Sequence, residues 1–199
     1  MSIRGLLHLA AILGLPAIGV TLWAWGQPLI CTCGTVELWV GSIWSSGNSQ
    51  HIADWYTLSH IIHGALIGLA GWGLARLIGF NAIYAFAIVT GVGWEIVEHT
   101  DWVLDAFRAT TINQGYIGDS VLNAVMDYVF MMGGFGLASA VRPLWSLLLI
   151  AVLELAAAAI ARDSLTLSTL MLLWPIEAVD SWQQELNPRA VPPAPEAGQ

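Results

Sequence analysis

Charged residues are scarce in this sequence, since only 10% of its 199 residues are Asp, Glu, Lys or Arg. A soluble domain usually carries about 25% charged residues. Hydrophobic residues make up 57% of the chain, and the mean hydropathy is +0.70. Too few charges are present to cover a water-facing surface. The composition therefore predicts a membrane protein whose main solvent is lipid.

Basic residues are scarcer still, with 6 against 14 acidic residues and a net charge of −8. Binding to nucleic acid needs a basic face, so this balance predicts no nucleic-acid partner. The sequence also has no Gly-rich phosphate loop and no Gly-x-Ser-x-Gly elbow. Nucleotide chemistry and ordinary serine hydrolysis are therefore not expected.

The only two cysteines, Cys31 and Cys33, are one residue apart. A disulfide between them would be strained, and a single Cys-x-Cys lacks the second half that most metal sites have. We interpret the pair as packing or turn-forming residues. A redox role and a metal role remain the alternatives.

Apolar stretches near the length of a spanning helix, about 20 residues, recur along the chain. They predict an all-α, polytopic transmembrane helical bundle in a single domain over residues 1–186, with a polar loop at 27–57. The first stretch is too long for a cleaved signal peptide and is expected to be a retained signal anchor. The Pro-rich tail, 187–199, is expected to be disordered. Six spans are predicted, at about 5–26, 58–79, 82–104, 119–141, 144–161 and 165–179.

The arginines predict the orientation in a bacterial inner membrane. With the N-terminus inside and six spans, four of the six arginines lie on the cytoplasmic side, where basic residues are favoured. Both termini are then cytoplasmic, and the loop 27–57 is periplasmic. The cytoplasmic arginines would be Arg4, Arg76, Arg142 and Arg189, and the periplasmic ones Arg108 and Arg162.

Small and aromatic residues predict how the bundle is packed and anchored. Gly64 with Gly68, and Gly91 with Gly93, would let helix backbones approach closely. Tryptophans near the outer interface would form an aromatic belt, and a cradle for a lipid substrate is the alternative. These tryptophans are Trp23, Trp25, Trp39, Trp44, Trp55 and Trp102.

Ionisable residues from four segments fall at the same outer level of the membrane on this topology. Residues three or four apart share one face of a helix, so each segment presents its polar groups together. Such groups cost several kcal/mol in hydrocarbon unless paired, which makes them candidates for function. The predicted site consists of His60, His63, Glu95, Glu98, His99, Asp119 and Asn123, supported by Asp54, Asp127 and Arg162.

Some of these residues have structural alternatives. Asp119 follows Gly118 and is well placed as a helix N-cap, where an acid contributes about 1 kcal/mol without any chemistry. His60 and His63 could simply donate hydrogen bonds to Glu95 or Glu98 across a helix interface.

The chemistry of imidazoles and carboxylates together allows three hypotheses. His60, His63 and Glu98 could hold a divalent metal such as zinc, iron or manganese, although their spacing is not that of a zincin helix. The same groups could act as a metal-free acid–base pair, with Arg162 binding an anionic headgroup. A proton or cation relay is the third hypothesis.

Five stretches of the sequence form recognisable motifs, namely Ile30-Cys-Thr-Cys-Gly34, Asn48-Ser-Gln-His-Ile-Ala-Asp-Trp-Tyr-Thr-Leu-Ser-His-Ile-Ile-His-Gly64, Trp94-Glu-Ile-Val-Glu98, Gly118-Asp-Ser-Val-Leu-Asn123 and Arg162-Asp-Ser-Leu-Thr-Leu167. These motifs resemble an uncharacterised family of proteobacterial multi-pass membrane proteins, which implies a membrane location and no assigned activity. The order Asp54, His60, Glu98, Asp119-x-x-x-Asn123 is also faintly similar to VanZ-like membrane proteins. Trp55, where that family often has Lys, departs from its pattern, as does the longer loop before Asp119.

The main functional hypothesis is an enzyme of the bacterial inner membrane that acts on a lipid or lipid-linked substrate at the outer leaflet. An accessory subunit of a larger membrane complex is the second hypothesis. A small transporter is the third, and the scarcity of charge in the inner halves of the helices counts against it.

Overall fold

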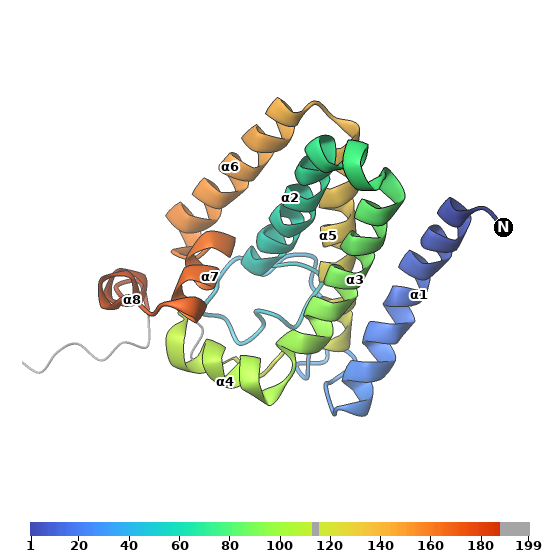
Figure 1. Ribbon diagram of the computed structural model, residues 1–199. Coiled ribbons are helices and arrows are strands. Elements are labelled where there is room, and N and C mark those ends of the chain that lie inside the picture. The colour runs from blue at the N-terminus through green and yellow to red at the C-terminus, as the bar shows by residue number, and fades with distance from the viewer. Residues whose placement is uncertain (113–115, 188–199) are drawn as a thin grey trace, which may run out of the picture.

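The computed structural model describes residues 1–112 and 116–187. These ranges contain helices and loops and no strand, which confirms the all-α prediction. Figure 1 shows α2, α3 and α5 at the centre, with α1 and α6 on opposite sides. The helices are α1 (Ile3–Ala24), α2 (Trp55–Ile78), α3 (Phe80–Glu98), α4 (Asp101–Thr110), α5 (Val121–Ala140), α6 (Pro143–Ala161), α7 (Leu165–Leu173) and α8 (Glu177–Gln184).

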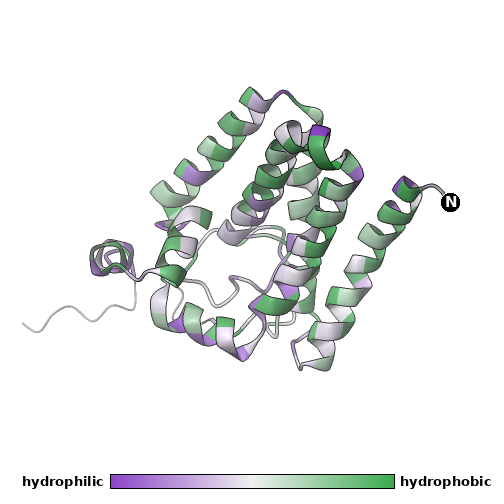
Figure 2. Ribbon diagram, viewed as in Figure 1, coloured by the Kyte–Doolittle hydropathy of each residue, from purple (hydrophilic) through white to green (hydrophobic). Residues whose placement is uncertain are grey.

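Five of these helices, α1, α2, α3, α5 and α6, are long and apolar enough to cross a membrane. Hydrophobic residues make up most of each of these helices (Figure 2), and many of them are exposed; Leu155 on α6, for example, is 70% exposed. Such surfaces are costly in water and favourable in lipid. The chain is therefore a helical membrane bundle, as its composition predicted.

The last predicted span, 165–179, is not one helix. It is divided into α7 and α8, because Pro175 lacks a backbone N–H and disfavours a helical Trp174. The described residues thus hold five helices long and apolar enough to span a membrane, one fewer than predicted. The location of both termini in the cytoplasm stays a prediction. Arg189 and the predicted tail from residue 188 lie outside the described residues.

The third predicted span, 82–104, is shorter than expected. α3 ends at Glu98, and the chain turns at His99 and Thr100 into the short amphipathic helix α4. α4 buries Val103 and Leu104, whereas Trp102 is 78% exposed. This turn brings residues after α3 back across the end of the bundle.

The backbones of α2 and α5 are in direct contact, as the pairing of small residues predicted. A Cβ atom added to Gly64 would overlap the carbonyl of Met131, and one added to Gly134 would overlap the carbonyl of Ile61. A Cβ on Gly68 would lie 2.7 Å from the carbonyl oxygen of Phe135. Only glycine fits at these positions, so the glycines determine how closely the two helices approach.

The two glycines of the second predicted pair, Gly91 and Gly93, differ in how closely other side chains pack against them. Gly91 on α3 packs against Tyr128, whose ring would lie 2.9 Å from an added Cβ. Gly93 has open space beside it and forms no such contact.

One end of the bundle collects the connections that shape the candidate site. α1, α3 and α6 end there, and α2 and α5 begin there, so the long loop 25–54 and the short helices α4 and α7 all lie at this end (Figure 1). Four of the six predicted belt tryptophans, Trp23, Trp25, Trp39 and Trp102, are exposed at 42% or more. Trp44 in the loop and Trp55 at the start of α2 are partly buried instead.

The contact between α2 and α5 can be tested with alanine variants of neighbouring glycines. Gly134→Ala should lower the free energy of unfolding by about 2 kcal/mol or more, because overpacking a tight interface moves the backbone. Gly133→Ala is the matched control, since nothing lies within 4 Å of an added Cβ there. Thermal unfolding in detergent measures both. Equal melting temperatures for the two variants would contradict the proposed contact.

Candidate functional site

Six ionisable side chains from four segments are buried together at the loop end of the bundle. None is more than 9% exposed, although all were expected at a membrane interface. They come from α2, from the end of α3 and the turn after it, from the segment before α5, and from α5 itself. The six are His60, Glu95, Glu98, His99, Asp119 and Asp127.

The loop 25–54 is attached to this cluster through the start of α2. Asp54 caps α2, because its carboxylate accepts hydrogen bonds from the backbone N–H groups of Ser49, at 2.6 Å, and Tyr56, at 2.8 Å. Thr57 completes a capping box by accepting from the N–H of Asp54 at 3.1 Å. Burial raises the pKa of Asp54 to about 6 against the effect of these hydrogen bonds. Asp54 therefore supports the site structurally.

The start of α5 is capped by Ser120 and not by Asp119. The Ser120 hydroxyl accepts from the N–H of Asn123 at 3.1 Å. Asn123, a predicted site residue, donates from Nδ2 to the carbonyl of His51 at 2.8 Å and does not line the cavity described below. The N-cap alternative for Asp119 is thus wrong, and Asn123 anchors the loop.

His99 positions Asp119 and is not available for chemistry. The backbone N–H of Asp119 can only donate, so Nε2 of His99 accepts from it, at 2.8 Å. Nδ1 must then carry the ring proton, which it donates to the carbonyl of Glu95 at 2.7 Å. Both nitrogens are occupied. His99 is consequently a positioning residue, whereas the sequence placed it among the reactive groups.

Three carboxyl groups, those of Glu95, Glu98 and Asp119, each offer an oxygen within 4.8 Å of the other two. The Tyr116 hydroxyl lies 2.7 Å from Asp119 and 3.3 Å from Glu98. A phenol has one proton, so its main hydrogen bond is the short one to Asp119, and the contact with Glu98 is the weaker of the two. Oε2 of Glu95 and Oε2 of Glu98 are buried and have no hydrogen-bond partner among the described residues.

Burial dominates the electrostatics around Asp119. It raises the pKa of Asp119, and His99, Tyr116 and Ser49 oppose that rise. Burial, together with the charges of Asp119 and Glu98, also raises the pKa of Tyr116 well above its ordinary value. The phenol therefore stays protonated and serves as a hydrogen-bond donor.

His60 lies between two carboxylates. Its Nδ1 is 3.3 Å from Oε1 of Glu95, and its Nε2 is 3.7 Å from Oδ2 of Asp127. Asp127 is held from the other side by the hydroxyl of Thr57 at 3.0 Å. The imidazole of His60 therefore lies between carboxyl groups from α3 and α5.

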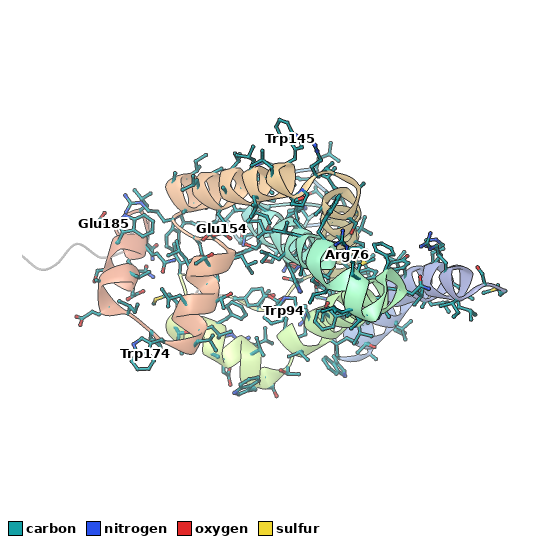
Figure 3. All side chains as sticks on the ribbon, turned by 45° about the horizontal axis from the view of Figure 1, so that its top comes forward. Arg76, Trp94, Trp145, Glu154, Trp174 and Glu185 are labelled. Atoms are coloured by element: carbon teal, nitrogen blue, oxygen red, sulfur yellow. A yellow bond between two sulfur atoms is a disulfide. The ribbon has the colours of Figure 1, made fainter. Side chains whose placement is uncertain are left out.

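A cavity of about 270 Å³ opens beside these groups. One wall is polar and comes from α2, α3, α5 and the segment before α5, whereas α4 and α7 supply a largely apolar wall. Figure 3 looks toward the opening between these helices, with Trp94 at its edge. The lining residues are Ser49, Tyr56, Ser59, His60, His63, Trp94, Glu98, Phe107, Tyr116, Asp119, Asp127, Leu165, Ser168, Thr169 and Leu172.

The predicted metal ligands His60, His63 and Glu98 do not form a three-ligand group within the described residues, where the carboxyl trio takes that place. His60 is instead directed at Glu95 and Asp127. Arg162 is also not at the cavity, because its guanidinium lies 4.5 Å from the Trp182 ring and bonds Glu185 at 3.0 Å. Arg162 holds α8, and its predicted role in binding a headgroup has no support in its position.

Several cavity residues were not predicted, namely Tyr116, Tyr56 and the α7 residues Ser168 and Thr169. Tyr116 belongs to a loop with no helical pattern, and Ser168 and Thr169 were expected within a sixth span. Spacing along the chain gave no signal for Tyr116, Ser168 and Thr169, since they reach the site only through the folding of α4 and α7 across the end of the bundle. Tyr56 lies four residues before His60 on α2, so helical spacing could have placed it on the same face.

Comparison with known proteins identifies close relatives of this chain. Residues 22–185 match a family described as a protein of unknown function (DUF2585). This chain belongs to that family. No solved structure matches it. The UPF0314 protein of Paracoccus denitrificans is 47% identical over 166 residues, covering 83% of this chain and 85% of that protein.

Two rhizobial relatives cover still more of the chain. The UPF0314 protein of Sinorhizobium fredii is 46% identical over 179 residues, covering 89% of this chain and 91% of the relative. That of Rhizobium meliloti is 45% identical over 181 residues, covering 90% and 92%. The predicted resemblance to an uncharacterised proteobacterial family is therefore confirmed. The fainter similarity to VanZ-like proteins is not shown and rests on the order of residues alone.

Asp163 connects the apolar wall of the cavity to α2. Its carboxylate accepts hydrogen bonds from the N–H of Ser164 at 2.9 Å, the hydroxyl of Ser168 at 2.9 Å and the hydroxyl of Tyr56 at 3.2 Å. Asp163 is only 3% exposed, and this burial raises its pKa to about 6. The position of α7 thus depends on a carboxyl group that is costly to ionise.

The raised pKa of Asp163 predicts a pH-dependent stability. An unfolded Asp has a pKa of about 3.9, so the folded protein, in which the pKa of Asp163 is about 6, binds this proton more tightly. The proton's contribution to the free energy of unfolding is therefore fully present below about pH 4 and is lost as the pH rises through about 6. The loss amounts to about 3 kcal/mol. In Asp163→Asn, melting temperatures measured in detergent from pH 4 to 7 should fall less steeply than in wild type.

Asp105→Asn is the control for this experiment, because Asp105 is exposed and pairs only with Arg108. It should keep the wild-type slope. Part of the fall in melting temperature with rising pH should remain in Asp163→Asn, because the pKa of Asp54 is also raised to about 6. An unchanged slope in Asp163→Asn would show that this carboxyl does not titrate as expected.

Proposed function

We propose that this protein is a membrane enzyme that acts on the polar head of a lipid or lipid-linked substrate. The cavity carries the proposal, because one wall holds ionisable groups while the wall from α4 and α7 holds none and is largely apolar. An amphipathic substrate would place its head against the carboxyl and imidazole groups and its chain along α7. Entry from lipid is favoured because α7 is a short, apolar helix beside α2 and α4.

A divalent cation fits the carboxyl trio as a cofactor. Glu95, Glu98 and Asp119 gather without any Lys or Arg among the lining residues, and two of their buried oxygens have no partner among the described residues. Carboxylates crowded in a low dielectric repel one another unless protons or a cation neutralise them. An all-oxygen donor set suits Mg²⁺ or Mn²⁺ better than zinc. When bound, such an ion would polarise a phosphoryl or carbonyl oxygen of the substrate.

The remaining polar residues suit acid–base work. His63 lines the cavity, is half-buried and has no hydrogen-bond partner in the described part of the chain. It can accept a proton from a substrate hydroxyl or a water molecule. Tyr116, which stays protonated, donates a hydrogen bond to Asp119 of the carboxyl trio. His60 lies beside Asp127.

The proposed location is the outer leaflet of the bacterial inner membrane. It follows from the positive-inside rule, with Arg4, Arg76 and Arg142 at the end of the bundle opposite the cavity. A transporter is less well supported. Between the cavity and that opposite end lies a packed apolar cluster that includes Ile67, Ile88 and Phe135.

The cation can be tested with Mn²⁺ as the probe. Purified wild-type protein should bind one Mn²⁺ per chain in an electron paramagnetic resonance titration, and Glu98→Gln should bind at least about tenfold more weakly. Glu154→Gln is a matched control, since Glu154 lies on α6 outside the cavity and contacts the N–H of Thr166. If the wild-type protein does not bind Mn²⁺, the hypothesis of a bound cation is wrong and only the acid–base hypothesis is left.

The substrate class can be tested in cells. A deletion strain should accumulate an unprocessed lipid or lipid-linked cell-wall precursor, measured by mass spectrometry of membrane extracts. Wild type and Asp105→Asn should restore the profile, whereas Glu98→Gln and His63→Ala should not, because they remove the carboxyl and the free imidazole. The enzyme hypothesis fails if both cavity variants restore the wild-type profile. Restoration of that kind would favour an accessory subunit of a membrane complex.

A further inference from the structure

A second group of reactive side chains lies in the loop between α1 and α2. We propose that Cys31, Cys33 and His51 form a thiol–disulfide exchange centre that is separate from the cavity. The sulfur and nitrogen atoms of the three residues lie within 4.8 Å of one another. Cys31 and Cys33 are joined by a disulfide across a turn closed by the Gly34 N–H and the Cys31 carbonyl. The expected turn is thus present, with a disulfide in addition.

The disulfide stabilises the fold less than most disulfides do. Closing a loop of three residues removes less entropy from the unfolded chain than closing a longer loop, so the bond contributes less to folding. The two sulfurs also differ in access, because Cys31 is 6% exposed whereas Cys33 is exposed. One accessible and one sheltered sulfur is the arrangement needed for an attacked and a resolving cysteine.

His51 is oriented to stabilise a thiolate at Cys33. Its Nδ1 accepts a hydrogen bond from the backbone N–H of Glu37 at 3.1 Å, so the ring proton is on Nε2. Nε2 lies 3.9 Å from Sγ of Cys33. Gly47 leaves room for this ring position, since a Cβ there would lie 3.0 Å from Nε2. His51 is 3% exposed, so the ring is fixed in place.

Other donors complete the surroundings of the two sulfurs. The backbone N–H of Cys33 donates to Sγ of Cys31 at 3.2 Å, and the hydroxyl of Thr35 lies 3.2 Å from Sγ of Cys33. The segment that carries His51 is itself held firmly, because the His51 carbonyl accepts from Asn123 at 2.8 Å. Both sulfurs can therefore leave as stabilised thiolates.

The co-reactant is a dithiol, either small or part of another protein. One of its thiolates attacks Sγ of Cys33, the Cys31–Cys33 bond breaks, and Cys31 leaves as a thiolate that takes up a proton. The second thiolate attacks the partner sulfur of the mixed disulfide and releases Cys33, which is also protonated. The partner loses two electrons and two protons and becomes a disulfide. This chain gains them as two thiols.

Equilibration of the purified protein in glutathione buffers, followed by maleimide labelling, tests the exchange. Two thiols should appear together and reversibly as the buffer becomes more reducing, with the protein still folded. In reduced Cys31→Ser protein, Cys33 should react with iodoacetamide at pH 7 about tenfold faster than in Cys31→Ser/His51→Leu, because the imidazole raises the thiolate fraction. Gly47→Ala, which pushes a methyl group against Nε2, should also slow the reaction. Melting temperatures of all variants exclude unfolding as the cause.

Three results would overturn the proposal: a disulfide that stays oxidised across the whole glutathione range, equal alkylation rates with and without His51, or stoichiometric zinc on the reduced protein that His51→Leu loses. The zinc result would assign a metal site instead. The mass of Cys31→Ser protein purified without reductant identifies the source of the co-reactant. A glutathione adduct indicates a small thiol, and a larger reducible adduct indicates a protein.

Discussion

The backbones of α2 and α5 touch where Gly64 and Gly134 carry no side chain, and the geometry of the cavity depends on this contact. It brings Thr57 within 3.0 Å and His60 within 3.7 Å of Asp127 across the helix interface. A methyl group between the helices would lengthen these distances and leave a buried carboxylate without partners, which is costly in a low dielectric. The close contact between α2 and α5 therefore determines both the packing of the two helices and the pairing of the polar side chains between them.

Most polar groups at this end of the bundle are satisfied by backbone donors and acceptors from loops. Asp54 and Ser120 cap the two central helices, and His99 uses both ring nitrogens. Among the described residues at this end, Oε2 of Glu95, Oε2 of Glu98, Oδ1 of Asn123 and the side-chain amide of Asn48 are buried without a hydrogen-bond partner. Buried polar groups are usually satisfied. Of these residues only Glu98 lines the cavity, so its unpaired oxygen is the one that points to ligand binding.

The fold could be predicted in large part from local patterns. Five apolar stretches became helices, because helix formation in lipid depends mainly on length and hydropathy. Four of them have ends close to those expected, whereas α3 ends six residues earlier, at Glu98 and not at 104. The site was predicted less completely. Asp54 and Asp119 look alike in sequence, yet one caps a helix and the other faces the cavity. Arg162 was expected at the cavity but holds α8, since α7 turns the chain away after residue 163.

Composition and residue spacing along each helix were enough to predict a helical membrane bundle with its ionisable residues at one end. Which of those residues converge depends on the tertiary structure. Glu95, Glu98 and Asp119 meet with Tyr116, and His51 meets the cysteines, through loops that fold back over the bundle. Loop paths depend on contacts between residues far apart in sequence, and no local pattern records them.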